Sequence, residues 1–379
     1  MSRVHLDHNA TTPLRPEARE ELLRALDALG GNPSSVHTSG RAARAELDEA
    51  RERIAAALGV DADELIFTSG GTEANNAALF GAAPQGGAVL VGAAEHSSVR
   101  EAADALGASG RELRVLGVDP DGRLNVEGLE IALQDGSAGL VSCVGANNEV
   151  GSVAPFAKIR EAIEVFPRER RPVWHADCVQ MLGKVPVNPR ALGLSLASFS
   201  AHKVGGPLGV GILWCAKEQP FSARMVGGGQ ESGLRSGTEN LPAIAAAAVA
   251  IELAVAELED YAARTRSLTE ELWRGILASV PAAELVGPAL DESERLPNTL
   301  CALLPGEDGR VLVPRLDLAG LEVSAGSACS SGSIEPSPVL LALGHDEKAA
   351  RAALRFSLGR TTTPEEVRVA IQVVGTTCG

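Results

Sequence analysis

Between about residues 60 and 215, short apolar runs alternate with amphipathic stretches, and this alternation limits the possible folds more than any other feature. The apolar runs have the length of strands, whereas the stretches between them repeat apolar residues at helical spacing. The expected strands are 65–67, 88–91, 113–118, 140–144, 173–174, 196–199 and 210–214, and the expected helices are 73–80, 99–106, 126–133 and 156–165. Strands that alternate with helices favour an α/β fold with a mostly parallel sheet. Ligands of such sheets bind beyond the carboxyl ends of the strands.

The sequence on either side of this region predicts further parts. An extended segment precedes an expected helix at 17–29, and a long helical region spans 241–279. After Pro281, strand-like runs surround two or three helices, which indicates a smaller α+β domain. We therefore expect an N-terminal arm over residues 1–15 that joins the small domain, a large domain over 16–255 and a small C-terminal domain over 256–379.

Composition and charge exclude several classes of protein. A hydrophobic content of 45% is too high for a disordered chain. The 34 basic and 49 acidic residues give a net charge of −15, which disfavours general binding to nucleic acid or to an anionic membrane. The longest apolar run, 243–251, is too short to cross a bilayer, and the N-terminus lacks a hydrophobic signal segment. We therefore expect a cytoplasmic protein that contacts neither nucleic acid nor membrane.

One of the six cysteines stands in an unusual context. No Cys-x-x-Cys pair occurs, which argues against a zinc site, and we expect no metal. Cys329 is surrounded over 324–333 only by Ser, Ala and Gly, whereas the other five cysteines are expected to be buried structural thiols. A thiol on such a loop could reach into a cleft and out again. A buried thiol in a turn is the alternative interpretation.

The first motif that could carry chemistry lies where an expected strand meets an expected helix. Here Ser69, two glycines and Thr72 precede the helical stretch. Unpaired N–H groups at a helix start attract anions, and glycines such as Gly71 allow close approach, so the motif favours a phosphate. The alternative is a plain capped turn. The lysine of an ATP- or GTP-binding loop is absent.

Two more strand ends carry reactive groups. Asp177 follows the apolar run at 173–174, where a carboxylate could pair with a ring-nitrogen cation, and Gln180 could bind a ring substituent. A capping aspartate is the alternative interpretation. Lys203, one of only five lysines, follows the apolar run at 196–199 and precedes two glycines. Burial there would lower its pKa and favour a nucleophilic amine. The alternative is a solvated loop lysine, which is the context expected for most of the other lysines.

Two side chains occur singly in apolar surroundings. Arg355 lies inside the strand-like run 354–358, where its guanidinium needs a partner. That partner could be a substrate carboxylate held by two hydrogen bonds, or a structural Asp or Glu. His96 follows the expected strand at 88–91 and could stack on a planar ligand or donate a proton. A satisfied core histidine is the alternative.

A phosphate site, a carboxylate and a strand-end lysine, in this chain order, are the groups that hold pyridoxal 5′-phosphate. At this point the sequence closely resembles the NifS/IscS-type cysteine desulfurases of the class-V aminotransferase-like family. The matching segments are 6–13, 31–35, 71–73, 147–149, 176–177, 200–203, 227–231, 235–238, 326–329 and 354–357. The resemblance implies a fold-type-I enzyme with a mostly parallel seven-stranded sheet in its large domain. The shorter C-terminal domain would then carry the catalytic cysteine loop.

The resemblance also implies roles for individual residues. Lys203 would form a Schiff base with pyridoxal 5′-phosphate, with Asp177 on the ring nitrogen and His96 over the ring. The remaining cofactor ligands would be Asn148 and Gln180 on the ring oxygen and Gly71, Thr72, Ser200, His202 and Thr238 on the phosphate. Thr238 would come from the second subunit of a homodimer. Arg355, helped by Asn32, would bind the substrate carboxylate, and Cys329 would accept the sulfur.

The function implied by the resemblance is the conversion of L-cysteine to L-alanine. The sulfur would pass to Cys329 as a persulfide and then to an acceptor protein, such as a scaffold for iron–sulfur assembly or another thiolation partner. The alternatives are a selenocysteine lyase, another β-lyase or an aminotransferase of the same fold, or a non-catalytic subunit of a sulfur-transfer complex. A transaminase would have no use for Cys329, and a binding module would need neither Cys329 nor Lys203.

Overall fold

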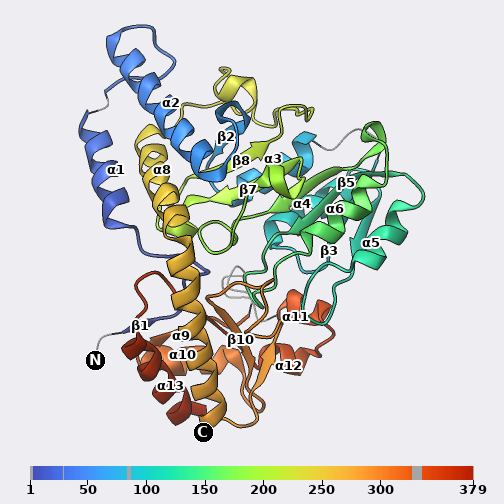
Figure 1. The fold of residues 1–379 in the computed structure, drawn as a ribbon, viewed down its shortest axis with the longest axis vertical. Helices are drawn as coiled ribbons and strands as arrows, with labels where there is room; N and C mark the ends of the chain where they lie inside the picture. The colour runs from blue at the N-terminus through green and yellow to red at the C-terminus, as the bar shows by residue number, and fades with distance from the viewer. Residues whose placement is uncertain (1–2, 29, 83–86, 327–334, 379) are drawn as a thin grey trace.

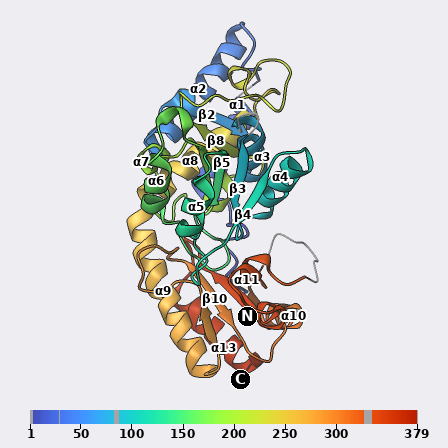
Figure 2. The ribbon, with the colours of Figure 1, turned by 90° about the vertical axis from the view of Figure 1, so that its right-hand side faces the viewer.

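The computed structural model describes residues 3–28, 30–82, 87–326 and 335–378. A larger α/β part is followed, through two consecutive helices, by a smaller part, which holds the C-terminus (Figure 1). The N-terminal segment runs back to this smaller part, so both described ends of the chain lie there (Figure 2).

The larger part is built on a seven-stranded sheet, which confirms the predicted α/β fold. Its strands are β2 (Leu65–Thr68), β3 (Ala88–Gly92), β4 (Leu113–Leu116), β5 (Ala138–Val144), β6 (Val173–Asp177), β7 (Leu196–Ser200) and β8 (Gly211–Cys215). The spatial order is β2-β8-β7-β6-β5-β3-β4. β8 runs antiparallel to both of its neighbours, and the other neighbouring pairs are parallel. The carboxyl ends of β5, β6 and β7 therefore lie along one edge of the sheet.

Helices cover both faces of this sheet, which explains why its strands read as continuous apolar runs. In β3, Val89 and Val91 pack into the core on the side of α3 and α4, whereas Leu90 packs into the core on the opposite face. The covering helices are α1 (Pro16–Ala28), α2 (Thr38–Leu58), α3 (Gly71–Ala82), α4 (Ser97–Ala108), α5 (Val126–Leu133), α6 (Phe156–Glu164) and α8 (Leu241–Ala256), with the short α7 (Pro189–Leu192) at one edge (Figure 2).

The helical region predicted at 241–279 is divided at Glu257. α8 ends at Ala256, and α9 (Leu258–Ser279) continues at an angle of 68°. α8 is apolar on nearly all sides and lies in the core, whereas α9 is amphipathic and extends along the smaller part (Figure 1). Within the described ranges, no single helix has the length and hydropathy to span a membrane, and only this bent pair would do so when taken together.

The smaller part contains an antiparallel sheet in the order β12-β10-β9. Its elements are β9 (Glu284–Val286), β10 (Thr299–Leu303), β12 (Ala353–Ser357), α10 (Gly309–Leu318), α11 (Pro338–Ala342), α12 (Glu347–Arg351) and α13 (Pro364–Cys378). The N-terminal strand β1 (Val4–His5) pairs in parallel with β11 (Leu321–Glu322). The residue limits of the three predicted domains stay a prediction.

Candidate active site

One cavity of about 280 Å³ gathers most of the side chains predicted from the sequence. Ten of them line it: Gly71, Thr72, His96, Asn148, Asp177, Gln180, Ser200, His202, Lys203 and Arg355. They come from the start of α3, from the segments after β3, β5, β6 and β7, and from β12 in the smaller part. The cavity thus lies at the carboxyl edge of the parallel strands, where ligands of α/β sheets bind.

Three predicted residues are not among those that line the cavity. Thr238 and Asn32 are exposed, and the Asn32 side chain accepts a hydrogen bond from the Ser34 amide at 2.9 Å. The segment that joins α1 to α2 lies at the end of the molecule opposite the C-terminus (Figure 1). Cys329 lies outside the described residues. Within this single chain, Thr238 and Asn32 therefore do not contribute to the cavity.

The start of α3 borders the cavity through Gly71 and Thr72. The helix begins directly after β2 at Gly71, and a Cβ atom at this position would lie 2.9 Å from Val179 Cγ2. The glycine therefore allows α3 to pack closely against the segment after β6, and the first N–H groups of a helix, which lack partners within it, can bind an anion. His202 lines the same cavity, and its ring pKa is lowered to about 4 by burial and by the charges of Lys203 and Lys184. It is thus neutral at neutral pH and can donate or accept a hydrogen bond.

Asp177 is a buried carboxylate held by neutral donors. It ends β6, is 5% exposed, and accepts hydrogen bonds from Asn75 Nδ2 at 2.8 Å and from the Val179 amide at 3.0 Å. Among the ion pairs of the described residues, none involves Asp177. Its charge is thus available to a cationic ligand in the cavity. Asn75 was missed by the sequence reasoning, although its place one turn into α3 could have suggested that it faces the same ligand.

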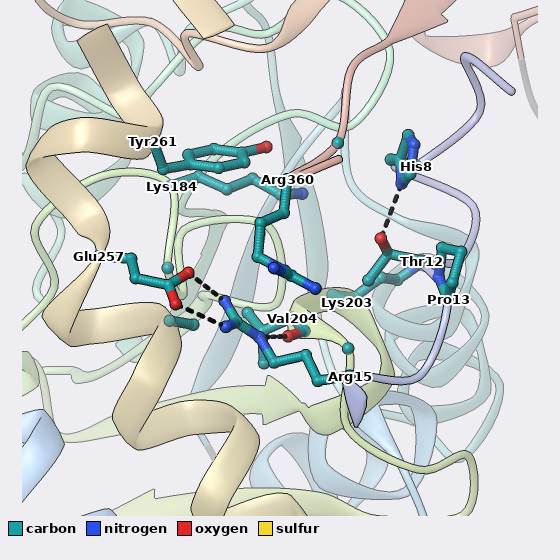
Figure 3. A pocket seen from close by; sticks show the side chains of 14 residues that line it. His8, Thr12, Pro13, Arg15, Lys184, Lys203, Val204, Glu257, Tyr261 and Arg360 are labelled. Carbon is teal, nitrogen blue, oxygen red and sulfur yellow. Dashed lines mark hydrogen bonds and ion pairs between the residues drawn. The ribbon is translucent and has the colours of Figure 1, made fainter. Parts of the chain in front are cut away.

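Lys203 follows β7 in the short helix η3 (Ala201–Val204), which ends at Gly205 with a φ of +82°. Its Nζ donates hydrogen bonds to the carbonyl oxygens of Asn9 and Ala10, both at 2.7 Å. Lys203 also lines a second cavity of about 40 Å³ (Figure 3). The amine is therefore held by two backbone carbonyl groups of the N-terminal segment.

Asn9 connects the N-terminal segment to the rest of the site. It is 1% exposed, and its Nδ2 donates to the Asn148 carbonyl at 3.1 Å and to Thr299 Oγ1 at 2.8 Å. Its own carbonyl accepts hydrogen bonds from Gln180 Nε2 at 2.9 Å and from Lys203 Nζ. Sequence reasoning used the segment that contains Asn9 only for the resemblance, because nothing local shows that an extended arm enters a distant site.

Arg355 pairs with Asp7, an acidic partner of the kind considered from the sequence, and it also lines the cavity. The side chain is 0% exposed, and its Nη2 lies 2.6 Å from Asp7 Oδ1. Its Nη1 donates to the Asn148 carbonyl at 3.4 Å, and its buried Nε has no partner in the described part of the chain. His96 caps α4, since its Nδ1 accepts a hydrogen bond from the Ser98 amide at 3.1 Å.

The five described cysteines are free thiols, and none of them lines the cavity. Four of them are buried, as predicted: Cys143, Cys178, Cys215 and Cys301. Burial raises their pKa, to about 12 for Cys143, Cys215 and Cys301, so they remain protonated at neutral pH. Cys378 is half-buried, and its pKa is raised to about 11. Such protonated thiols are poor nucleophiles.

Similarity to known proteins identifies the class. Residues 4–369 match the class-V aminotransferase family. The solved structure of a NifS-like protein superimposes with a TM-score of 0.91 at 35% identity, covering 99% of this chain and 98% of that one. A NifS-like protein from Rickettsia africae gives a TM-score of 0.85 at 32% identity, with 98% of each chain covered. The chain therefore belongs to the class-V aminotransferase family, whose members use pyridoxal 5′-phosphate.

Sequence relatives narrow the assignment within that family. A cysteine desulfurase of Cereibacter sphaeroides is 42% identical over 99% of this chain and 95% of its own length. The cysteine desulfurase IscS of Dictyoglomus turgidum is 40% identical over 98% of this chain and 93% of its own length. Within the class-V aminotransferases, this chain is a member of the cysteine desulfurases.

The residues around the cavity fit this cofactor. Its phosphate is an anion, its ring nitrogen can carry a proton, and its aldehyde reacts with a primary amine. The start of α3 can receive the anion, the buried Asp177 can pair with the ring nitrogen, and Lys203 supplies the amine. The buried Arg355 Nε and Asn75 Oδ1, which lack partners in the described part of the chain, also leave polar groups for ligands.

Proposed function

We propose that this cysteine desulfurase takes sulfur from L-cysteine with pyridoxal 5′-phosphate linked to Lys203, and that Cys329 receives the sulfur as a persulfide. The observation that carries the proposal is one cavity lined by a primary amine, a buried carboxylate, a helix start and a buried guanidinium. These are the groups that the cofactor and an amino-acid substrate require. When bound, the cofactor draws electrons away from the substrate Cα.

The protein's own residues would hold the reactants as follows. Asp177 keeps a proton on the ring nitrogen, because its buried carboxylate favours a cation beside it. The start of α3, with Thr72, Ser200 and His202, receives the phosphate, while Asn148 and Gln180 bind the ring oxygen. His96, fixed as the cap of α4, covers the ring.

The substrate and its protons are handled by three groups. Arg355 binds the carboxylate of L-cysteine, and Asp7 orients the guanidinium. Lys203 Nζ takes the proton from Cα and returns it as alanine forms. The Cys329 thiolate attacks the substrate sulfur, so that an S–S bond forms while the Cβ–S bond breaks, and Cβ is protonated to become the methyl group of L-alanine.

Two partners are proposed: a sulfur acceptor, because of the persulfide product, and a second copy of this chain, because of the exposed Thr238 and Asn32. A persulfide on Cys329 must be discharged, and we propose that a separate acceptor protein receives the sulfur. The exposed positions of Thr238 and Asn32 support a homodimer in which each subunit offers these side chains to the cavity of the other.

Mass spectrometry of the holoenzyme after incubation with L-cysteine tests this function. We expect L-alanine in solution and one added sulfur on the peptide that contains Cys329. Borohydride should fix the cofactor on the peptide that contains Lys203. Cys329→Ser should abolish sulfide release and Lys203→Ala should abolish fixation, whereas Cys378→Ser and Lys217→Ala should behave like the wild type. Full sulfide release by Cys329→Ser would overturn the assignment of the acceptor.

A further inference from the structure

Lys184 is a buried lysine to which the proposed function gives no role. Sequence reasoning expected most lysines other than Lys203 to be exposed, but Lys184 is only 3% exposed. It lines the smaller cavity together with Lys203 and Tyr261 (Figure 3). Burying an amine in such a place is costly unless its N–H groups find acceptors.

The Lys184 amine finds its acceptors in two amide side chains. Nζ donates to Asn9 Oδ1 at 3.1 Å and to Gln180 Oε1. Among the ion pairs of the described residues, none involves Lys184, so no carboxylate offsets its burial. Burial, followed by the charges of Lys203 and Arg355, lowers its pKa well below the usual range. The amine has N–H groups for both acceptors whether or not it is protonated.

The contact with Gln180 fixes the direction of that amide. Because Lys184 binds Oε1, Nε2 must lie on the other side, where it donates to the Asn9 carbonyl at 2.9 Å. An amide nitrogen has two hydrogens, so one N–H of Gln180 remains for the cavity that this side chain lines. Without Lys184, the amide could turn over and present its oxygen instead.

We propose that Lys184 is a positioning residue that holds Gln180 with an N–H toward the cavity, so that this N–H binds the ring oxygen of the cofactor. The inference rests on the proposed function, because it takes the cofactor as the ligand. Lys184 also holds the Asn9 side chain, and the Asn9 carbonyl receives the other Gln180 N–H and Lys203 Nζ. One amine thereby orients both partners of the Gln180 hydrogen bond.

The test is a double-mutant cycle on cofactor affinity. Apoprotein of the wild type, Lys184→Met, Gln180→Ala and the double variant is titrated with pyridoxal 5′-phosphate, and the visible absorption of the bound cofactor is recorded. Each single variant should raise the Kd about tenfold, the effect of one oriented hydrogen bond to a charged group. The double variant should also raise it only about tenfold, because Lys184 acts through Gln180. Both single variants should shift the visible band in the same direction.

Controls separate this inference from the proposed function and from folding. Lys217→Met changes an exposed lysine paired with Asp63 and should leave the Kd and the spectrum unchanged. Lys184→Gln keeps a donor for Gln180 Oε1 and should keep the Kd within about threefold of the wild type.

Additive losses of cofactor affinity in the double variant, or a wild-type Kd in Lys184→Met, would overturn the inference even if the wild type converts L-cysteine. Failure of both Lys184 variants to fold would assign Lys184 a structural role only. A wild type that does not bind the cofactor would instead overturn the proposed function.

Discussion

Arg355 could bind the substrate carboxylate or serve only the ion pair with Asp7, and an experiment can separate these two roles. Arg355→Lys keeps the charge and the ion pair with Asp7 but removes two-point binding of a carboxylate. We expect the KM for L-cysteine to rise between tenfold and about a hundredfold, while kcat changes less, because a charged hydrogen bond contributes about 1.5–3 kcal/mol. Steady-state kinetics measure both constants.

The matched control is Arg351→Lys, which alters an arginine paired with the exposed Glu347 on α12. It should leave the KM unchanged. An Arg355→Lys enzyme with a normal KM but lower thermal stability would show that Arg355 serves the ion pair alone.

A second prediction concerns His175, which lies between Ser142 Oγ at 2.8 Å and Ser198 Oγ at 3.0 Å. Burial lowers its pKa from 6.5 to about 4. Between pH 6.5 and 4 the unfolded chain therefore binds a proton on His175 that the folded chain does not bind. The free energy of unfolding falls as the pH is lowered through this range. His175→Gln has no titrating group at this position and lacks this loss. The difference in free energy of unfolding by which it is less stable than the wild type should therefore shrink by about 2 kcal/mol between pH 7 and pH 5. Urea unfolding of the apoproteins at both pH values measures it.

His345→Gln, a change at a half-buried histidine, provides the comparison. If the difference in free energy of unfolding between His175→Gln and the wild type stays constant with pH, the fold does not keep His175 neutral.

The sequence could predict a site residue where its position follows from the neighbouring residues in the chain. Lys203, Asp177 and Gly71 follow apolar runs, so their place at the edge of the sheet follows from the alternation of strands and helices. Lys184 and Asn9 could not be found, because their contacts join segments far apart in the chain, as the 175 positions between them show. Whether a lysine is buried depends on such long-range contacts, so the sequence around the lysine shows no pattern that predicts its burial.

Among the elements, the seven sheet strands and most of the helices that cover them were predictable. Every strand except β4 is buried along most of its length, so both of its faces are mostly apolar. Two features were not. The helix α2 was missed, and the region 241–279 read as one helix because no proline or glycine marks the break at Glu257. Glu257 forms an ion pair with Arg15 at 2.9 Å, a long-range contact that the sequence pattern does not show.

The helix α8 offers a prediction at this scale. Its Ala247 is 0% exposed in the core that faces the sheet, so Ala247→Leu would force extra atoms into filled space. We expect a loss of about 1–3 kcal/mol in the free energy of unfolding, measured by urea denaturation. Ala256→Leu, at the exposed end of the same helix, should change it by less than about 0.5 kcal/mol. Equal stability of Ala247→Leu would show that α8 is loosely packed.

For the whole molecule, the homodimer proposed above can be tested by complementation. Lys203→Ala removes the amine of its own cavity, and Thr238→Asp would place a negative charge against the phosphate of the partner's cavity. Each variant alone should be inactive. Coexpressed chains should regain about a quarter of the wild-type activity, because half of the dimers are mixed and each mixed dimer has one intact cavity.

Thr376→Asp introduces the same charge on α13 and should be active by itself. No recovery on coexpression, while sedimentation shows mixed dimers, would mean that Thr238 does not cross between subunits.

The path of the N-terminal arm has a consequence for biosynthesis. Asn9 lies against Ser357, and Asp7 against Arg355, and each pair is separated by 348 positions in the chain. The cavity is therefore lined both by the N-terminal arm, through Asn9, and by β12, through Arg355. A ribosome-bound nascent chain that stops before β12 lacks Arg355, so we expect loading of the vitamin B6 cofactor to begin only after β12 has left the ribosome.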